Sequence, residues 1–375
     1  MKFQYSKPYF DNVELDNVQE CIKSTFVGAF GPYLDKFNKD FKDYIWAPFG
    51  MGISNASTAL HLACIAAGLK KEDQVIAPNF TFVSSINCIK YVGATPIFID
   101  ADYESYSIDP NQLESALTKY TKAIIVPHLY GRPAKIEQIF DFACKHGLIL
   151  IEDNAQSYGS FVGNGNPGGN NPKMTGNFGK ISVYSFNSIK MMSCGEGGYI
   201  TTNDEKIFAH INQLQQHGST PGTKYFHDKI GFNYRMTNLQ ASVLCAQFEK
   251  LPKFIEKRRQ IHNWYVQYLK DIKEINLPPE INYGFDVYWI NNIFLADQLI
   301  GKKELFMQKL LEEGIETRPM FTPINRLPMY RTTQYFPVSD FFWKRGVSLP
   351  TYYTMSEEDI YSISKIIKNI IFEIK

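Results

Sequence analysis

Short apolar runs alternate with helical segments between about residues 50 and 205, and this alternation restricts the fold more than any other feature. The runs that we interpret as strands are VIAP (75–78), PIFID (96–100), AIIVP (123–127), LILIED (148–153), ISVYSF (181–186) and GGYITTND (197–204). Apolar and polar residues barely alternate within them, as is typical of strands covered on both faces. Helical stretches such as STALHLACIAAG and KIEQIFDFACKHG separate several of them. The pattern predicts an α/β sheet with crossover helices.

The length of 375 residues predicts a large domain and a smaller one. We place the large α/β domain, with an N-terminal arm, at 1–250 and a helix-rich C-terminal domain at 251–375. Residues 163–177 are rich in Gly, Asn and Pro and predict a long surface loop.

Three helices are expected in the C-terminal part. Residues 238–273 predict one long helical stretch that is broken only by Pro252. Residues 302–313 predict a helix that ends at Gly314 in the left-handed conformation. The residues Thr354 and Glu357 match a capping box that opens the last helix.

Composition excludes several classes of protein. The formal net charge is +1, and no basic stripe of the kind that binds nucleic acid is visible. No segment approaches the roughly 18 apolar residues of a membrane span, and the N-terminus lacks the apolar stretch of a signal peptide. The six cysteines are scattered without a CxxC pair, which predicts free, mostly buried thiols and no metal site. We therefore expect a cytoplasmic protein whose anionic ligands are held by a local site.

Asp153 ends the apolar run LILIED, which places a carboxylate at the carboxyl edge of the predicted sheet. Ligands of open α/β sheets bind at that edge. An ionised aspartate there can pair with a protonated ring nitrogen. Taken alone, the residue is better explained as a helix N-cap.

Lys190 follows the strand that ends near Ser185, and glycines lie just beyond it at Gly195, Gly197 and Gly198. A desolvated lysine amine forms imines with carbonyl compounds. Ser185 can donate to a phosphate, and the glycines permit tight turns. A lysine in a loop is most often a solvated charge, so only the surrounding pattern favours a catalytic role.

The residues Asn55, Ala56, Ser57 and Thr58 lead directly into a predicted helix. Amides and hydroxyls at a helix N-terminus form a site suited to phosphate. An ordinary Ser or Thr cap explains the same residues, so this segment gains weight only together with Asp153 and Lys190.

Taken together, the motifs resemble those of the DegT/DnrJ/StrS family of sugar aminotransferases, over almost the whole chain. The stretches that carry the resemblance, in family order, are GP (31–32), SNASTALHLA (54–63), VIAPNFTFVSS (75–85), VGATPIFID (92–100), HLYG (128–131), IEDNAQSYG (151–159), SFNSIK (185–190), GEGG (195–198), NYRMTN (233–238) and ETRP (316–319). The resemblance implies fold type I of the pyridoxal-phosphate enzymes, which is aspartate aminotransferase-like. In that fold a large mixed-sheet domain precedes a smaller C-terminal α+β domain.

The resemblance also implies a cofactor, pyridoxal 5'-phosphate, which passes through its pyridoxamine form. By this resemblance Lys190 carries the cofactor as an imine and shuttles a proton, and Asp153 pairs with the pyridine nitrogen. Gln156 lies by the ring and its phenolic oxygen, and Phe82 stacks on the opposite face, unless it is plain core.

The phosphate contacts implied by the family are Ser57, Thr58 and Ser185, with Asn233 of the partner subunit. The protein would thus be a homodimer with shared active sites. Dehydrating relatives carry His at the lysine position, so Lys190 argues against that branch.

Three departures from the family pattern stand out. Ala56 replaces the usual Gly of the phosphate turn, Met191 and Met192 replace more polar residues, and the 163–177 loop is longer than usual. None of these changes alters the amine of Lys190.

The substrate implied by the resemblance is a nucleotide-linked 4-keto-6-deoxyhexose that receives the amino group of L-glutamate at C4. The stretches 195–198, 216–241 and 314–330 resemble C4-aminating members that act on a GDP-linked sugar. The alternatives are a UDP- or dTDP-linked sugar, aminated at C4 or, less favoured, at C3. Candidate substrate contacts are Tyr225, Arg318 and Asn325. Two alternatives stay open: a catalytically silent regulator that keeps the cofactor pocket, and a cofactor-free binding module in which Lys190 is a surface charge.

Overall fold

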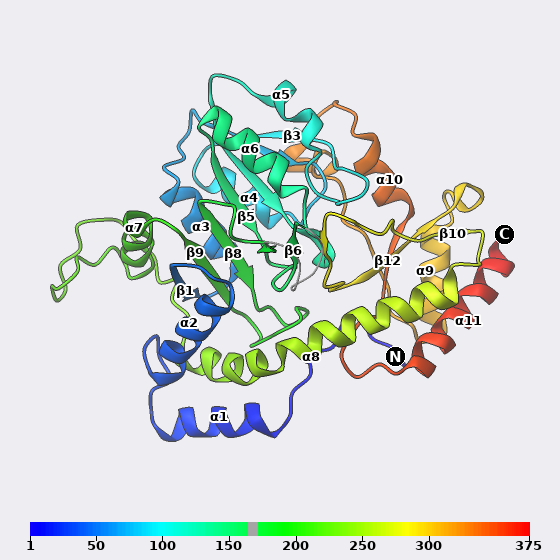
Figure 1. The fold of residues 1–375 in the computed structure, drawn as a ribbon, viewed down its shortest axis with the longest axis horizontal. Coiled ribbons are helices and arrows are strands. Elements are labelled where there is room, and N and C mark those ends of the chain that lie inside the picture. The colour runs from blue at the N-terminus through cyan, green and yellow to red at the C-terminus, as the bar shows by residue number, and fades with distance from the viewer. Residues whose placement is uncertain (164–171) are drawn as a thin grey trace.

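The computed structural model describes residues 1–163 and 172–375. Its centre is a seven-stranded sheet with the strand order β1-β9-β8-β5-β4-β2-β3 (Figure 1). The strands are β1 (Phe49–Ile53), β2 (Gln74–Pro78), β3 (Thr95–Ile99), β4 (Thr121–Pro127), β5 (Ile149–Asp153), β8 (Ile181–Ser185) and β9 (Gly198–Thr202). Strands β3, β2, β4, β5 and β8 are parallel. Strand β9 pairs antiparallel with β8 and with β1, so β9 is the one strand of these seven that runs in the opposite direction. The α/β prediction is confirmed; β1 is a strand that the sequence pattern missed.

Helices cover both faces of this sheet. They are α3 (Ala56–Ala66), α4 (Ser84–Tyr91), α5 (Leu113–Ala116), α6 (Ile136–His146) and α7 (Glu205–Gln215). On β4, Ala123 and Ile125 belong to the same buried cluster as residues of α3 and α4. Their neighbours Ile124 and Val126 belong to the cluster that includes α6. Because successive side chains both meet a helix layer, the strand is apolar without alternation.

The longest helix, α8 (Asn238–Leu269), has 32 residues and runs diagonally across Figure 1. It packs against α1 (Asn12–Lys23) and α2 (Pro32–Tyr44) near its start and against α11 (Glu357–Ile374) near its end. The prediction that Pro252 breaks this helix is wrong. The neighbouring Leu251 and Phe254 are buried, and the packing of both halves outweighs the hydrogen bond lost at Pro252. The proposed domain boundary near residue 250 falls inside α8.

The C-terminal part contains a four-stranded antiparallel sheet in the order β10-β12-β14-β13. Its strands are β10 (Ile275–Asn276), β12 (Asn291–Leu295), β13 (Arg318–Pro319) and β14 (Gly346–Leu349), and its helices are α9 (Lys303–Glu312), α10 (Pro337–Arg345) and α11. Gly314 is left-handed with φ of 79°, as predicted. The capping box of α11 is formed by Ser356 and Asp359, so the predicted pair Thr354 and Glu357 is wrong by two residues. Both pairs fit the same spacing pattern, and backbone geometry selects the later one.

A small sheet joins β11 (Gly284–Phe285), β6 (Phe161–Val162) and β7 (Lys173–Met174). The prediction of a loop at 163–177 is therefore wrong at Lys173–Met174, and residues 164–171 of that segment lie outside the described residues. Short 3-10 turns occur at Pro110–Gln112, Leu129–Gly131, Asp297–Leu299, Ile324–Arg326 and Pro328–Tyr330.

The hairpin at 216–233, between α7 and α8, projects from the body of the molecule (Figure 1). Within the described chain, no helix is both long and apolar enough to cross a bilayer. In the same residues, no three His, Cys, Asp or Glu side chains gather as metal ligands would. The cysteines are free, and all are buried except the exposed Cys144 and the partly exposed Cys194.

Candidate active site

A cavity of about 960 Å³ lies at the carboxyl edge of the central sheet, where Asp153 ends β5 and Ser185 ends β8. Seven of the predicted cofactor contacts line it: Ser57, Thr58, Phe82, Asp153, Gln156, Ser185 and Lys190. The fold thus brings together three motifs that are far apart in the sequence. This edge is also where open α/β sheets bind ligands.

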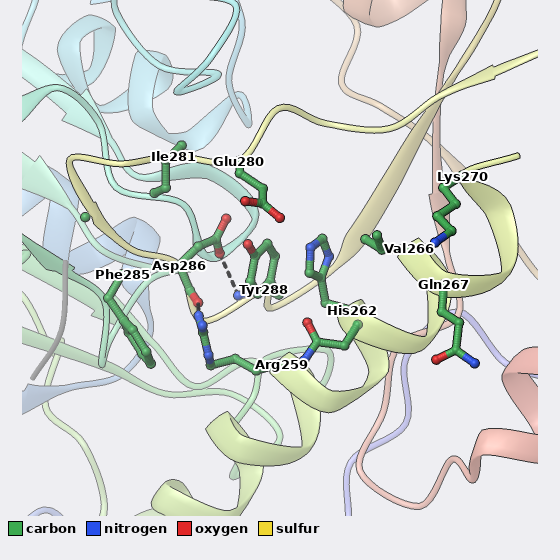
Figure 2. A pocket seen from close by; sticks show the side chains of 12 residues that line it. Arg259, His262, Val266, Gln267, Lys270, Glu280, Ile281, Phe285, Asp286 and Tyr288 are labelled. Carbon is green, nitrogen blue, oxygen red and sulfur yellow. Dashed lines mark hydrogen bonds between the residues drawn. The ribbon is translucent and has the colours of Figure 1, made fainter.

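A separate cavity of about 530 Å³ lies between α8 and residues 280–288 (Figure 2). There His262 of α8 stacks on Tyr288 with ring centres 3.6 Å apart, and Arg259 lies 4.0 Å from the ring centre of Phe285. None of the predicted site residues lines it. The larger cavity is therefore the candidate active site.

The Lys190 amine faces this cavity from the turn after β8. Its Nζ lies 4.1 Å from the ring centre of Trp289. Burial lowers the pKa of Lys190 from its usual value to about 8, and the negative charge of Asp153 opposes part of that shift. A lysine with this pKa has a substantial neutral fraction near pH 8 and is nucleophilic. The alternative that Lys190 is a solvated surface charge does not fit this environment.

The Asp153 carboxylate is almost fully buried and is held at both oxygens. Its Oδ2 accepts a 2.7 Å hydrogen bond from the Ser85 hydroxyl, and its Oδ1 accepts the N–H of Ala155 at 3.0 Å. These bonds fix the direction of the carboxylate in the cavity. A turn and not a helix follows Asp153, so the residue is not a helix cap.

Gln156 and Phe82 line the same cavity, where they offer a hydrogen-bond donor and an aromatic face to a planar ring. The Oε1 of Gln156 accepts the backbone N–H of Tyr130 at 2.8 Å, which leaves the amide NH₂ available as a donor. Phe82 is 52% exposed and lies beside Phe321, with ring centres 5.9 Å apart. A phenylalanine so exposed is not core, and its exposure is to the cavity.

The N-terminus of α3 forms the phosphate side of the cavity. Asn55 caps the helix by accepting the N–H of Thr58 at 3.0 Å, and the first-turn N–H groups at Ala56 and Ser57 have no acceptor within the helix. The Thr58 hydroxyl donates to the Asn55 carbonyl at 2.8 Å.

Gly198, the first residue of β9, lies directly against this turn. A Cβ on it would lie 2.5 Å from the Asn55 carbonyl carbon and 2.7 Å from the Ala56 nitrogen. The last glycine of the GEGG motif thus permits β9 to approach the helix N-terminus.

The donors and acceptors present fit pyridoxal phosphate. The α3 N-terminus with Ser57 and Ser185 suits its phosphate, the amine of Lys190 suits its aldehyde, and the carboxylate of Asp153 suits its ring nitrogen.

Four predicted residues lie outside the cavity lining. Asn233 and Tyr225 belong to the projecting hairpin, where Tyr225 is 98% exposed. Arg318 is exposed and pairs with Glu316 at 2.6 Å. The side-chain oxygen of Asn325 accepts from Asn79 and its nitrogen donates to the Gln334 carbonyl, each at 3.1 Å. The substrate and partner roles of these four residues stay predictions.

The sequence profile described as the DegT/DnrJ/EryC1/StrS aminotransferase family matches residues 8–368. The chain belongs to this family. Its membership confirms the predicted enzyme class, a pyridoxal-phosphate-dependent sugar aminotransferase, and the predicted cofactor.

Among its relatives, the chain is similar to the GDP-perosamine synthase of Escherichia coli O157:H7, with 35% identity over 95% of each chain. It is 34% identical to the GDP-perosamine synthase of Vibrio cholerae over 97% of each chain. The crystal structure of the aminotransferase TlmJ from Streptoalloteichus hindustanus superposes with a TM-score of 0.92 over 100% of both chains, at 22% identity. This likeness confirms the fold type I prediction.

The structure explains two departures of this DegT/DnrJ/EryC1/StrS chain from the family pattern. Ala56 is the first residue of α3 and does not have a positive φ, so Gly is not required there. Met191 and Met192 are buried in the core, and the N–H of Met192 donates to the Tyr158 hydroxyl at 2.8 Å. Apolar side chains therefore suit the turn that follows the family lysine.

Sequence reasoning missed several residues of the site. Tyr5, Trp289 and Phe321 line the cavity from distant parts of the chain, and no local pattern marks them. Ser85 is the last residue of the stretch 75–85 that resembles the family. Its position three residues after Phe82 could have indicated that it lies near the site.

Proposed function

We propose that this aminotransferase transfers the amino group of L-glutamate to C4 of a nucleotide-linked 4-keto-6-deoxyhexose, with the GDP-linked sugar as the preferred substrate. The observation that carries the proposal is that the Lys190 amine and the Asp153 carboxylate line the same cavity. The choice of sugar is supported by the two GDP-perosamine synthases to which nearly the whole chain is similar.

Lys190 performs two tasks in this reaction. When bound, pyridoxal phosphate supplies an aldehyde that condenses with amines and a ring that accepts an electron pair. The Nζ of Lys190 would hold the aldehyde of the cofactor. Once free of it, the same Nζ would act as the base that takes the proton from Cα of glutamate and as the acid that delivers a proton to C4 of the sugar. A pKa of about 8 suits both directions of proton transfer.

The carboxylate of Asp153 would hold the ring nitrogen of the cofactor. The hydrogen bonds from Ser85 and Ala155 maintain its orientation without neutralising it. Aromatic side chains at Phe82 and Trp289 limit the access of water to the amine.

The cavity lining has too few positive charges to balance the anionic groups of these substrates. Among its described lining residues, Lys190 is the one cation, and Asp153 and Glu196 are carboxylates. The cofactor phosphate, the sugar diphosphate and the two carboxylates of glutamate are all anionic. Arg318 lies 5.8 Å from the ring centre of Tyr5, which lines the cavity, and is one candidate within the chain. We propose that a second subunit supplies further positive charge.

The projecting 216–233 hairpin is suited to that role. It carries Lys224 and Lys229, and its Ile230 is 92% exposed, which is unfavourable for an isolated chain in water. We therefore propose a homodimer in which the hairpin of each copy, with Asn233 at its base, completes the cavity of the other.

The test of the proposed function offers the purified enzyme a panel of GDP-, UDP- and dTDP-linked 4-keto-6-deoxy sugars with L-glutamate. Mass spectrometry identifies the sugar that gains an amine, and NMR locates the amine at C4 or C3. We expect the GDP-linked sugar to react with the highest kcat/KM. Preference for a UDP- or dTDP-linked sugar would overturn the choice of nucleotide.

An absorbance measurement on the same purified protein distinguishes an enzyme from a catalytically silent regulator. An enzyme loses the imine absorbance band when glutamate is added, whereas a silent binder keeps it. Loss of the band without amination of any sugar in the panel would contradict the substrate class and leave the aminotransferase chemistry intact.

A further inference from the structure

The Lys190 amine rests on the face of an indole. Its Nζ lies 4.1 Å from the ring centre of Trp289, a residue that is 3% exposed and lines the cavity. We propose that Trp289 is a positioning residue that receives the Lys190 ammonium on its ring face whenever the lysine is not bonded to the cofactor. The inference rests on the proposed function of Lys190 and assigns a partner to the released form of its amine.

The plane of the indole is fixed relative to the lysine. Trp289 donates its Nε1–H to the carbonyl of Ile189, the residue just before Lys190, at 3.1 Å. The Ser6 hydroxyl donates to the same carbonyl at 3.0 Å. The carbonyl oxygen of Trp289 accepts from Arg258 of α8 at 2.9 Å. The indole is therefore hydrogen-bonded directly to the residue before Lys190, and the backbone of Trp289 is held by Arg258.

The carboxylates that share the cavity with Lys190 already have donors. Asp153 accepts from Ser85 and Ala155, as described above, and Oε1 of Glu196 accepts from the side chain of Asn187 at 2.6 Å. The other titratable groups that line the cavity are Tyr5, His61, Tyr91 and Tyr234. Within residues 1–163 and 172–375, Nζ of Lys190 has no hydrogen-bond or ion-pair partner. The indole face is thus the available partner of the ammonium.

The contact also joins distant parts of the chain. Lys190 follows β8 of the central sheet, whereas Trp289 precedes β12 of the C-terminal sheet. Trp289 lies over Tyr130 in a nearly parallel arrangement, with ring centres 6.5 Å apart. The ring therefore has little freedom to leave the lysine.

The experiment uses the cofactor-free protein and measures the rate at which the imine absorbance grows after pyridoxal phosphate is added, across pH 6 to 10. The rate follows the neutral fraction of Lys190, so its midpoint gives the pKa of the amine. Removal of a cation–π partner disfavours the ammonium and lowers the midpoint by about 0.5 to 1.5 pH units. We expect this full shift in Trp289→Leu, which keeps an apolar side chain but has no ring face.

Trp289→Phe keeps a ring face that binds cations less strongly than indole and loses the Nε1–H bond. The expected order of midpoints is wild type highest, then Trp289→Phe, then Trp289→Leu. A midpoint in Trp289→Leu that equals or exceeds that of the wild type would overturn the inference. If Trp289→Leu does not fold, an unchanged midpoint in Trp289→Phe overturns it.

The failure of the proposed function gives a different result in the same assay. If wild-type protein produced no imine band at any pH, the assignment of Lys190 as the cofactor lysine would fail. An imine band with midpoints independent of residue 289 would remove only the role of Trp289.

Discussion

Ser85 donates a 2.7 Å hydrogen bond from its hydroxyl to Oδ2 of Asp153. Ser85 lies at the start of α4 and is buried, and its own hydroxyl lies 3.3 Å from that of Thr81. The bond connects the helix after β2 to the end of β5. It makes the orientation of the Asp153 carboxylate depend on a residue that does not line the cavity.

Replacement of Ser85 is expected to reduce activity without removing any group that touches the substrate. A hydrogen bond to a charged group contributes about 1.5–3 kcal/mol, so Ser85→Ala should lower kcat roughly 10- to 100-fold. The KM for the sugar should change little, because Asp153 acts on the cofactor. Steady-state kinetics measure both constants.

The matched control is Ser85→Cys, which keeps the volume and a weaker donor and should give an intermediate kcat. A kcat for Ser85→Ala within twofold of the wild type, in a protein of unchanged melting temperature, would show that the bond has no positioning role.

Gly198→Ala is expected to weaken the binding of pyridoxal phosphate at least tenfold. The new Cβ would lie 2.5 Å from the Asn55 carbonyl carbon, so the N-terminus of α3 must move away from β9. Titration of the cofactor-free protein with pyridoxal phosphate, followed by absorbance, measures the affinity.

Gly147→Ala is the control, because this glycine replacement should lower stability without affecting the cofactor site. Gly147 ends α6 with φ of 63°, and its Cβ would meet no neighbouring atom within 4 Å. This variant should lose about 1 kcal/mol of stability and keep the cofactor affinity. Equal affinities of the two variants would contradict the role of Gly198.

Lys190 should make the cofactor-free protein less stable at neutral pH than at alkaline pH. Its pKa is about 8 in the folded protein and higher in the unfolded chain. Between these values the unfolded chain binds the extra proton, so the free energy of unfolding rises with pH and the penalty is complete below pH 8. Lys190→Met removes the penalty and should stabilise the protein at pH 7 by on the order of 1–3 kcal/mol.

Urea unfolding at pH 7 and pH 10 measures this difference. Lys122→Met, at an exposed position of β4, is the control for the introduction of a methionine. It should change the free energies of unfolding at pH 7 and pH 10 equally. A Lys190→Met variant that is no more stable than the wild type at pH 7 would show that the amine is not desolvated.

Shared active sites predict complementation between two inactive variants. Lys190→Ala removes the amine of its own cavity, and Asn233→Ala removes the proposed contact to the cavity of the partner. If Asn233→Ala alone is severely impaired, random mixing of the two variants should restore about a quarter of wild-type activity, because half of the dimers then contain one intact cavity of two. Activity is measured for the co-expressed mixture and for each variant expressed alone. No recovery would indicate that each chain builds its own site.

The sequence predicted the central sheet and part of the cavity for one physical reason. Parallel strands end at the same edge, so Asp153 and Ser185, each at the end of an apolar run, had to lie close together. The N-terminus of α3 joins them because Gly198 permits the close approach of β9. Local patterns therefore identified the residues that chain topology brings together.

The rest depended on packing between segments that are distant in the sequence. Trp289 and Tyr5 reach the cavity through tertiary contacts that no local period encodes. Pro252 predicts a break from local geometry, but the packing of α8 on both of its halves keeps the helix continuous. The helix cap at Ser356 was missed for a different reason, since Thr354 offers the same spacing two residues earlier.

The most direct test of the account is to locate the bond between the protein and pyridoxal phosphate. The enzyme loaded with the cofactor is reduced with borohydride, digested, and examined by peptide mass spectrometry. We predict a phosphopyridoxyl group on Lys190 and no label in Lys190→Ala. A label on another lysine, or none in the wild-type protein, would contradict it.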